Sequence, residues 1–296
     1  MIESQKTKRM NLSFYIVDVF TDKKYAGNQL AVFFGAEALS TEQMQQIARE
    51  INFAESTFIT KLNSETNTAT IRIFTPEHEM QFAGHPIIGT SWVLMNKIFE
   101  HQPVNITLSV PVGEIPVVKS GDLTWLQAAQ PQFLNTYLPE GFSSFSNLKR
   151  TDFNLEVPIQ EVTTGSAFVI VPLKNKQALK NLIIDKDKMN DWLHEHCKTN
   201  HRALYFYSLE HEKLTSRMLC VENNQLIEDA ATGSASTCLQ AFLLKYGGLE
   251  IKITNHQGEY INRPSQIYFD GKVADNHFDI KIGGQTKYIA KGTWEV

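Results

Sequence analysis

The sequence predicts an α+β protein made of two similarly folded domains. At 296 residues the chain is longer than one typical compact core, so about two domains are expected. Strand-like and helix-like patterns are mixed along the chain, and their order in the first half recurs in the second half. We therefore expect two sister domains with a cleft between them.

The first predicted element is a β-hairpin, in which β-rich runs at Phe14–Phe20 and Leu30–Phe34 flank the turn signal Ala26-Gly27-Asn28. A helix should follow. The segment Ser40-Thr41-Glu42-Gln43 has an N-cap residue with glutamine at the capping-box position, and apolar residues then recur at helical spacing. This amphipathic helix is expected to end near Asn52.

Two more strands and a second helix complete the first half. The runs Ser56–Leu62 and Ala69–Phe74 are rich in residues typical of strands, and Pro76 breaks the second one. The next helix should begin at Gly84-His85-Pro86, because proline is well tolerated in a first turn. Its following residues are apolar on nearly every side, which predicts a buried helix.

The same order recurs later in the chain. The segment Asn105–Ile115 is similar to Glu250–Tyr260, with glycine and glutamate in register and apolar residues alternating in both. Each copy follows a predicted buried helix, and the second such helix runs from Gly233 to Tyr246 before a pair of glycines. The pattern indicates a pair of sister domains rather than a longer array of repeats.

The remaining elements of the second copy match the first by order alone. They are a strand within Thr163–Val171 and a helix at Met189–Cys197, and the least regular stretch, Pro131–Pro158, is the candidate connection. We place the boundary near residue 127. The expected domains are residues 1–126 and 127–281, with the last strand, near residues 282–296, as a candidate to return to the first domain.

Composition excludes several classes of protein. With 28 Lys+Arg against 32 Asp+Glu, the net charge is −4 and no long basic run appears, so a nucleic-acid partner is not expected. No apolar run approaches the roughly 20 residues that span a bilayer, and no signal peptide is recognisable, so no membrane partner is expected either. Three cysteines without a C-x-x-C pair suit reduced thiols in a cytoplasm.

Both predicted buried helices begin with small residues, at Ala83-Gly84-His85-Pro86 and Ala231-Thr232-Gly233-Ser234. A helix N-terminus has unpaired backbone N–H groups and about half a positive charge, and glycine lets an anion approach closely. Two such ends facing each other across a pseudo-twofold axis would bind a carboxylate. The alternative is that each glycine only permits a tight turn.

Three titratable residues lie near these helix starts. Glu55 stands in an otherwise uncharged segment, where loss of hydration would raise its pKa and suit it to move protons near neutral pH. His85 lies at a helix start, where the helix dipole favours a neutral ring. Asp229 precedes the second glycine start and could accept N–H bonds or orient a substrate. The alternatives are a surface acid, a structural histidine and an N-cap-like aspartate.

Other kinds of site are poorly supported. The cluster His194-Glu195-His196-Cys197 lacks a second ligand pair, so we expect a solvated helix end and no metal. Neither a P-loop lysine nor a G-x-G-x-x-G run after a strand is present, so no nucleotide cofactor is expected. A Gly-x-Ser-x-Gly elbow is also absent, which disfavours a serine hydrolase.

A set of ordered motifs resembles the PhzF-like phenazine-biosynthesis proteins, which share the diaminopimelate epimerase fold. The motifs extend over essentially the whole chain. They are Val17-Asp18-Val19-Phe20, Gly27-Asn28, Ala31-Val32-Phe33, Ala48-Arg49-Glu50, Ala54-Glu55-Ser56-Thr57-Phe58, Arg72-Ile73-Phe74-Thr75-Pro76, Gly84-His85-Pro86 and Glu228-Asp229-Ala230-Ala231-Thr232-Gly233-Ser234.

The resemblance implies a fold, a reaction and a set of site residues. It implies two pseudo-twofold-related domains, each a curved, mostly antiparallel sheet wrapped around a central helix, in a homodimer. It implies a catalytic acid/base at Glu55. It also implies proton-handling and substrate-binding positions at Gly84, His85, Asp229, Thr232, Gly233 and Ser234. One departure is visible, since the family usually has proline where this chain has Ala230.

The same resemblance separates the chain from the two-cysteine racemases and epimerases. Those enzymes place one cysteine at the start of each central helix, and here Ala83 and Ala230 are expected at those places. We therefore predict a cofactor-independent isomerase that moves a proton within a small cyclic or amino-acid-like carboxylate. The best-known family member isomerises trans-2,3-dihydro-3-hydroxyanthranilate. The alternatives are an epimerase of amino-acid derivatives that uses Glu55 with His85, or a binding protein without turnover.

Overall fold

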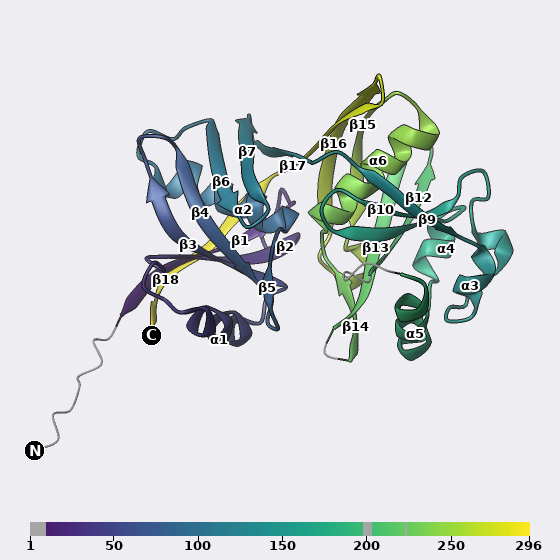
Figure 1. Ribbon diagram of the computed structural model, residues 1–296, viewed down its shortest axis with the longest axis horizontal. Helices are drawn as coiled ribbons and strands as arrows, with labels where there is room; N and C mark the ends of the chain where they lie inside the picture. The colour runs from purple at the N-terminus through teal and green to yellow at the C-terminus, as the bar shows by residue number, and fades with distance from the viewer. Residues whose placement is uncertain (1–9, 198–202, 223) are drawn as a thin grey trace, which may run out of the picture.

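Figure 1 shows two lobes side by side, with α2 in one and α6 in the other. This computed structural model describes residues 10–197, 203–222 and 224–296. The first half contains, in order, β1 (Asn11–Val19), β2 (Asn28–Phe34), α1 (Thr41–Ile51), β3 (Glu55–Asn63), β4 (Thr68–Phe74), β5 (Glu79–Met80), α2 (Gly84–Val93), a π-helical turn (Leu94–Ile98), β6 (Asn105–Val110), β7 (Gly113–Ser120) and β8 (Leu123–Gln127).

The second half repeats this order with extra short helices. It contains β9 (Gln132–Tyr137), α3 (Pro139–Ser143), a 3-10 turn (Arg150–Asp152), β10 (Ile159–Thr163), β11 (Ala167–Pro172), α4 (Lys176–Lys180), α5 (Lys186–His196), β12 (Ala203–Glu210), β13 (Lys213–Glu222), β14 (Gln225–Asp229), α6 (Gly233–Gly247), β15 (Glu250–Gln257), a second 3-10 turn (Glu259–Ile261), β16 (Ser265–Ala274), β17 (His277–Gly284) and β18 (Thr286–Glu295).

Strand pairing is the same in the two halves. A hairpin leads through helical segments to a parallel neighbour, β2 beside β3 in the first half and β11 beside β12 in the second. A second parallel pair spans each central helix, β4 with β6 and β13 with β15. The other pairings among the described strands are antiparallel. The α+β fold with largely antiparallel sheets is therefore confirmed.

The halves exchange strands at their junction. β8 pairs with β17 across the junction, and the chain then continues into β9, which pairs with β10. In the opposite direction, β17 is followed by β18, which lies in the first half and pairs with β1 from Asn11↔Glu295 to Val19↔Thr286. The domain boundary near residue 127 stays a prediction, because strands of each half pair with strands of the other, β8 with β17 and β18 with β1.

The two central helices carry the main core. α2 and α6 are buried along most of their length, and the largest cluster of buried apolar residues surrounds both of them. Because small and apolar residues cover every side of these helices, sheet strands can pack around them rather than against one face. α1 is amphipathic instead, burying Met44, Ile47 and Ala48 against the outer face of the first half.

Local signals in the sequence set several boundaries. The Ser40 hydroxyl accepts a hydrogen bond from the Gln43 N–H at 3.2 Å, and the Gln43 side chain accepts one from the Ser40 N–H at 3.0 Å, which confirms the capping box. The helix ends at Asn52 in the left-handed conformation. In the predicted hairpin, Gly27 has φ of 67°, and a Cβ there would lie 2.2 Å from the carbonyl oxygen of Val19. Glycine is required at this position.

One expectation about the connection was wrong. The stretch Pro131–Pro158 is not an irregular linker, because it holds the edge strand β9 and the short helix α3. β9 has no fully buried residue, so it lacks the alternating apolar pattern that marks a half-buried strand. None of the helices that the structure describes is long and apolar enough to cross a membrane.

Candidate active site at the joined helix tips

The N-termini of α2 and α6 touch each other. A Cβ atom on Gly84 would lie 2.8 Å from the Cα of Gly233 and 3.0 Å from the backbone nitrogen of Ser234. Neither helix has a side-chain cap or an acidic residue in its first turn. The first turns of two helices of 10 and 15 residues therefore lie close together without a capping side chain, which favours an anion such as a carboxylate.

The N-cap residues correct one assignment made from sequence. Ala83 is the N-cap of α2, but its counterpart in α6 is Thr232 rather than Ala230. The three cysteines, Cys197, Cys220 and Cys238, are free and buried, and none lies at either helix start. Neither helix tip can therefore supply the thiol pair of the two-cysteine enzymes.

Glu55 is the first residue of β3 and faces the tip of α2. Its side chain is only 17% exposed, and its Oε2 atom lies 3.6 Å from the Nε2 atom of His85. Burial, together with the nearby carboxyl groups of Asp229 and Glu222, raises the pKa of Glu55 well above its usual value. A carboxyl whose pKa is raised in this way is a stronger base, once ionised, than an exposed glutamate.

His85 is the second residue of α2, and its side chain is 3% exposed. Burial lowers its pKa to about 3, although an interaction with the backbone of Gln29 opposes part of that shift. The ring is therefore neutral at physiological pH. Its Nε2 atom has no hydrogen-bond partner in the described chain and lies toward Glu55.

Asp229 ends β14, just before the tip of α6, and is held by several donors. The Thr232 hydroxyl donates to one carboxylate oxygen at 2.6 Å, and the Asn28 amide donates to the other at 2.7 Å. Burial raises the pKa of Asp229, while these bonds and the backbone N–H groups of Ala230 and Ala231 oppose that rise. Asp229 is thus anchored beside the tip, and Thr232 takes the N-cap position.

Asn28 and Gln257 complete the site and were not singled out as site residues from the sequence. Asn28 also donates to the carbonyl of Ala231 at 3.0 Å, so a residue of the first half binds the second. Gln257 donates to the carbonyl of Asp229 at 3.0 Å and accepts from the backbone N–H of Thr232 at 3.1 Å. The signal for Asn28 was the Gly27-Asn28 turn, whereas Gln257 had no local signal.

A cavity of about 870 Å³ lies between the halves next to the central helices. Its lining includes Met80 and Phe82, which come just before α2, and the connector residue Ala129. Thr164, also in the lining, lies 2.6 Å from Thr237 of α6, oxygen to oxygen. Neither Glu55, His85 nor Asp229 is part of this lining, so the cavity lies beside the candidate site and is not itself the site.

The sequence cluster near His194 does not form a site in the structure. His194, Glu195 and His196 are exposed at the end of α5, and Cys197 is buried in the second core. Within the described residues, no group of three or more potential metal-binding side chains was found. The predicted site residues Glu55 and His85 are instead brought together with Gly84, Asp229, Thr232, Gly233 and Ser234 at the joined tips.

Fold and site together define an isomerase with an epimerase-like fold. The chain belongs to the phenazine biosynthesis-like protein family (PhzC-PhzF), whose profile it matches over residues 17–292. It is 31% identical to the trans-2,3-dihydro-3-hydroxyanthranilate isomerase of Pseudomonas chlororaphis, over 95% of this chain and 98% of that protein. The resemblance seen in the motifs and the prediction of a PhzF-type isomerase are confirmed at the level of the family.

Solved structures support the same fold. A PhzF-family phenazine biosynthesis protein of Bacillus anthracis superposes with a TM-score of 0.84 at 24% identity, covering 97% of this chain and 99% of that one. A hydroxyproline epimerase from Agrobacterium vitis superposes with a TM-score of 0.64 at 9% identity, covering 97% and 93%. Both likenesses concern the fold alone, and the second confirms the epimerase-like architecture.

Proposed function

We propose that the protein moves a proton between two carbons of a small cyclic or amino-acid-like carboxylate. The 3.6 Å contact between Glu55 and His85, at the joined helix tips, carries the proposal. The compound in the name of the Pseudomonas chlororaphis relative, trans-2,3-dihydro-3-hydroxyanthranilate, is the first candidate substrate. Its carboxylate, amine and ring match the chemistry that the tips and the carboxyl groups offer.

In the proposed reaction the substrate carboxylate binds the N–H groups of the two tips. Ionised Glu55 takes a proton from one carbon, the double bond shifts, and the same carboxyl returns the proton to another carbon. No atom is gained or lost in this shift. Neutral His85 accepts a hydrogen bond from protonated Glu55 between the two steps, and anchored Asp229 binds a polar substituent of the substrate.

The arrangement favours proton migration over epimerisation. An epimerase with two different bases needs them on opposite faces of one carbon, which places the two groups roughly 6 Å apart when each is within reach of that carbon. Glu55 and His85 are 3.6 Å apart, so both lie on one side of any substrate. One carboxyl that serves both carbons on a single face fits this spacing better.

The test is incorporation of deuterium from D₂O into trans-2,3-dihydro-3-hydroxyanthranilate and a panel of related cyclic and amino-acid carboxylates. Glu55→Gln keeps the shape of the side chain but removes the base, and it should lower exchange roughly 10²- to 10⁴-fold. The matched control is Glu222→Gln, which removes a neighbouring carboxyl and should keep exchange within a few fold at its own pH optimum.

Each outcome of this test is informative. Exchange that survives Glu55→Gln would reject the assigned base. Binding of a panel member with neither exchange nor double-bond migration would favour a protein that has lost turnover. Inversion of a stereocentre without double-bond migration, seen by chiral analysis of the product, would favour the epimerase.

We also propose that the protein works in the cytoplasm as a homodimer. Its three buried cysteines are free thiols, which suits a reducing compartment. The dimer is an expectation that comes with the family. Sedimentation equilibrium of the full chain at several concentrations tests it, and a single species of 33.6 kDa at every concentration would reject it.

A further inference from the structure

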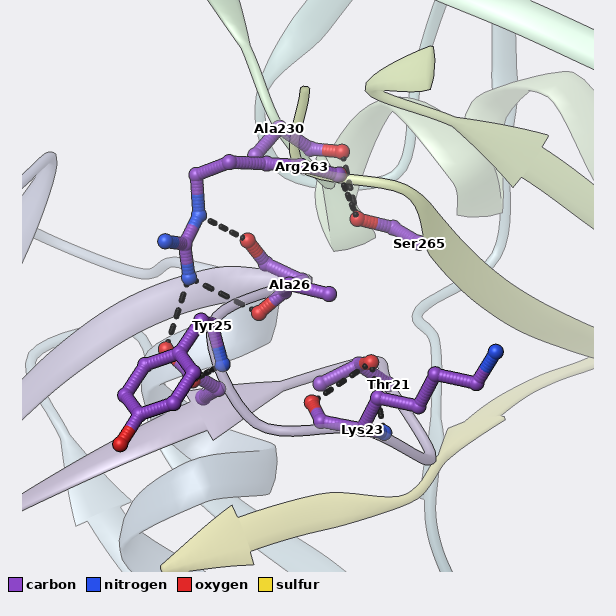
Figure 2. A network of polar contacts seen from close by, with 9 residues as sticks. Thr21, Lys23, Tyr25, Ala26, Ala230, Arg263 and Ser265 are labelled. Carbon is purple, nitrogen blue, oxygen red and sulfur yellow. Dashed lines mark hydrogen bonds and ion pairs between the residues drawn. The ribbon is translucent and has the colours of Figure 1, made fainter. Parts of the chain in front are cut away.

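Arg263 of the second half forms hydrogen bonds to the loop that precedes Asn28 in the first half. It lies between the second 3-10 turn and β16. Its Nε atom donates to the carbonyl of Gly27 at 2.7 Å, and its Nη2 atom donates to the carbonyl of Ala26 at 2.8 Å and to Oδ1 of Asp18 at 2.7 Å (Figure 2). All three acceptors belong to the first half.

The loop itself is closed around Asp18. The second carboxylate oxygen of Asp18 accepts the backbone N–H of Tyr25 at 2.7 Å, so one buried side chain, 3% exposed, ties both ends of the loop to Arg263. The backbone N–H of Gly27 donates to the carbonyl of Pro264 at 3.1 Å. The loop can therefore not shift relative to this segment without breaking several bonds at once.

The same segment also reaches the other side of the site. The Ser265 hydroxyl donates to the carbonyl of Ala230 at 2.8 Å (Figure 2). Gly27 immediately precedes Asn28, and Ala230 immediately follows Asp229. The segment from Arg263 to Ser265 thus holds the neighbours of both partners in the 2.7 Å bond from Asn28 to Asp229.

We propose that Arg263 is a positioning residue of the active site, which holds the loop Thr21–Gly27 so that Asn28 stays bonded to Asp229 and packed against His85. The proposal rests on the proposed function for its effect on turnover, but not for its effect on His85. Arg263 itself does not touch the reacting groups.

A role in geometry fits the pair better than a role in stability. Burial raises the pKa of Asp18 even with a guanidinium beside it, so ionising this carboxyl in the folded chain is costly. A guanidinium can bind two neighbouring carbonyls and a carboxylate with a fixed planar fork, whereas a lysine ammonium is a single point of charge. Arg263→Lys should therefore keep the charge and lose the geometry.

The first test does not use a substrate. The pKa of His85 is measured by NMR titration of its ring in the wild-type protein, in Arg263→Lys and in Arg72→Lys. The matched control Arg72 makes two bonds to Glu79, at 2.7 and 2.6 Å, is 26% exposed against 23% for Arg263, and joins elements within one half.

We expect the His85 pKa to rise from about 3 toward its ordinary value of 6.5 in Arg263→Lys and to stay unchanged in Arg72→Lys. Loosening the loop would let water reach the ring and reverse its desolvation. An unchanged His85 pKa in a folded Arg263→Lys variant would overturn the proposal. If that variant does not fold, Asp18→Asn, which keeps the shape of one acceptor, takes its place.

The second test uses turnover of trans-2,3-dihydro-3-hydroxyanthranilate. Arg263→Lys should lower kcat about tenfold or more with little change in KM, because the reacting groups are misplaced while the helix tips still bind the carboxylate. In an Asn28→Ala background, Arg263→Lys should lower kcat little further, because the bond from Asn28 to Asp229 through which Arg263 acts is already absent. Fully additive losses would overturn the proposal. If the wild-type protein does not turn over this compound, the proposed function fails, and the His85 titration still decides the role of Arg263.

Discussion

The Nε2 atom of His85 lies 3.6 Å from Oε2 of Glu55 without any other hydrogen-bond partner in the described chain. The amide nitrogen of Asn28 lies 3.3 Å from Nδ1 of His85, but its two N–H groups make the shorter bonds to Asp229 at 2.7 Å and to the carbonyl of Ala231 at 3.0 Å. The ring's interaction with the backbone of Gln29 must then use Nδ1–H. We assign the neutral tautomer that presents a lone pair from Nε2 to Glu55.

This tautomer predicts different effects for two substitutions of His85. Glutamine can place an oxygen acceptor near the Nε2 position, whereas asparagine reaches only as far as Nδ1. We expect His85→Gln to keep more of the activity and His85→Asn to lose roughly 10²-fold, a loss typical of a misplaced proton-handling partner. Initial rates of deuterium exchange compare the two variants, and equal activity in both would contradict the assigned tautomer.

Sequence patterns predicted the elements whose signals are local. The capping box at Ser40, the apolar faces of α2 and α6, and the Gly27 turn each depend on residues close in the chain. The candidate site residues Glu55 and His85 could be proposed for the same reason, because they stand at a strand start and in the first turn of a helix.

The contacts that hold the halves together could not be predicted in this way. The bond from Arg263 to the carbonyl of Gly27 joins residues 236 positions apart, and the bond from Asn28 to Asp229 joins residues 201 apart. A long-range pair leaves no periodic signal in a single sequence. The start of α6 at Gly233 was predicted correctly, but the position expected to match the second cysteine of the two-cysteine enzymes was placed at Ala230, whereas the N-cap is Thr232.

The carboxyl of Glu222 should contribute to the pH dependence of the reaction, in addition to burial and to Asp229, which raise the pKa of Glu55 more. Glu222 is one of the charges that raise the pKa of Glu55, so Glu222→Gln should lower that pKa. The base then ionises at lower pH, and the ascending limb of the rate against pH should move in the acid direction. His85, with a pKa of about 3, should add no limb above pH 5.

A matched control for this shift is Glu77→Gln. Glu77 raises the pKa of Glu222 and is not among the groups that raise the pKa of Glu55. Its replacement should leave the ascending limb nearly in place. If the ascending limb of the pH–rate profile moved equally in both variants, the total charge around the site, and not the carboxyl of Glu222 in particular, would control the pKa of Glu55.

Glu55 should reduce the stability of the fold at neutral pH. Because its pKa is raised in the folded state, the folded chain holds this proton more tightly than the unfolded chain does. Its contribution is most favourable below the unfolded pKa and is lost as pH rises through the folded pKa. We expect Glu55→Gln to raise the free energy of unfolding at pH 7 by about 1–3 kcal/mol, because the variant no longer has a buried carboxyl with few hydrogen-bond partners. The gain in the free energy of unfolding should be smaller at pH 4.

Urea unfolding of the variant and the wild-type protein at the two pH values measures this difference. Glu140→Gln is the control, because the Glu140 backbone and the neighbouring Arg150 lower the pKa of that exposed carboxyl. It should gain nothing at pH 7. A Glu55→Gln variant less stable than the wild type at pH 7 would mean that Glu55 is ionised at little cost, which contradicts its proposed tuning.

The contact between the helix tips should tolerate no side chain. A methyl group in Gly84→Ala would meet the Cα of Gly233 at 2.8 Å, and backbone cannot move aside as a side chain can. We expect a loss of about 1–3 kcal/mol in the free energy of unfolding, typical of overpacking, and weaker carboxylate binding because the N–H groups no longer converge. Gly247→Ala, at the other end of α6, has open space around the new methyl group and should be neutral or slightly stabilising. Urea unfolding and calorimetric titration with a carboxylate ligand measure both effects, and a Gly84→Ala protein as stable as Gly247→Ala with unchanged affinity would show that the tips do not form the anion site.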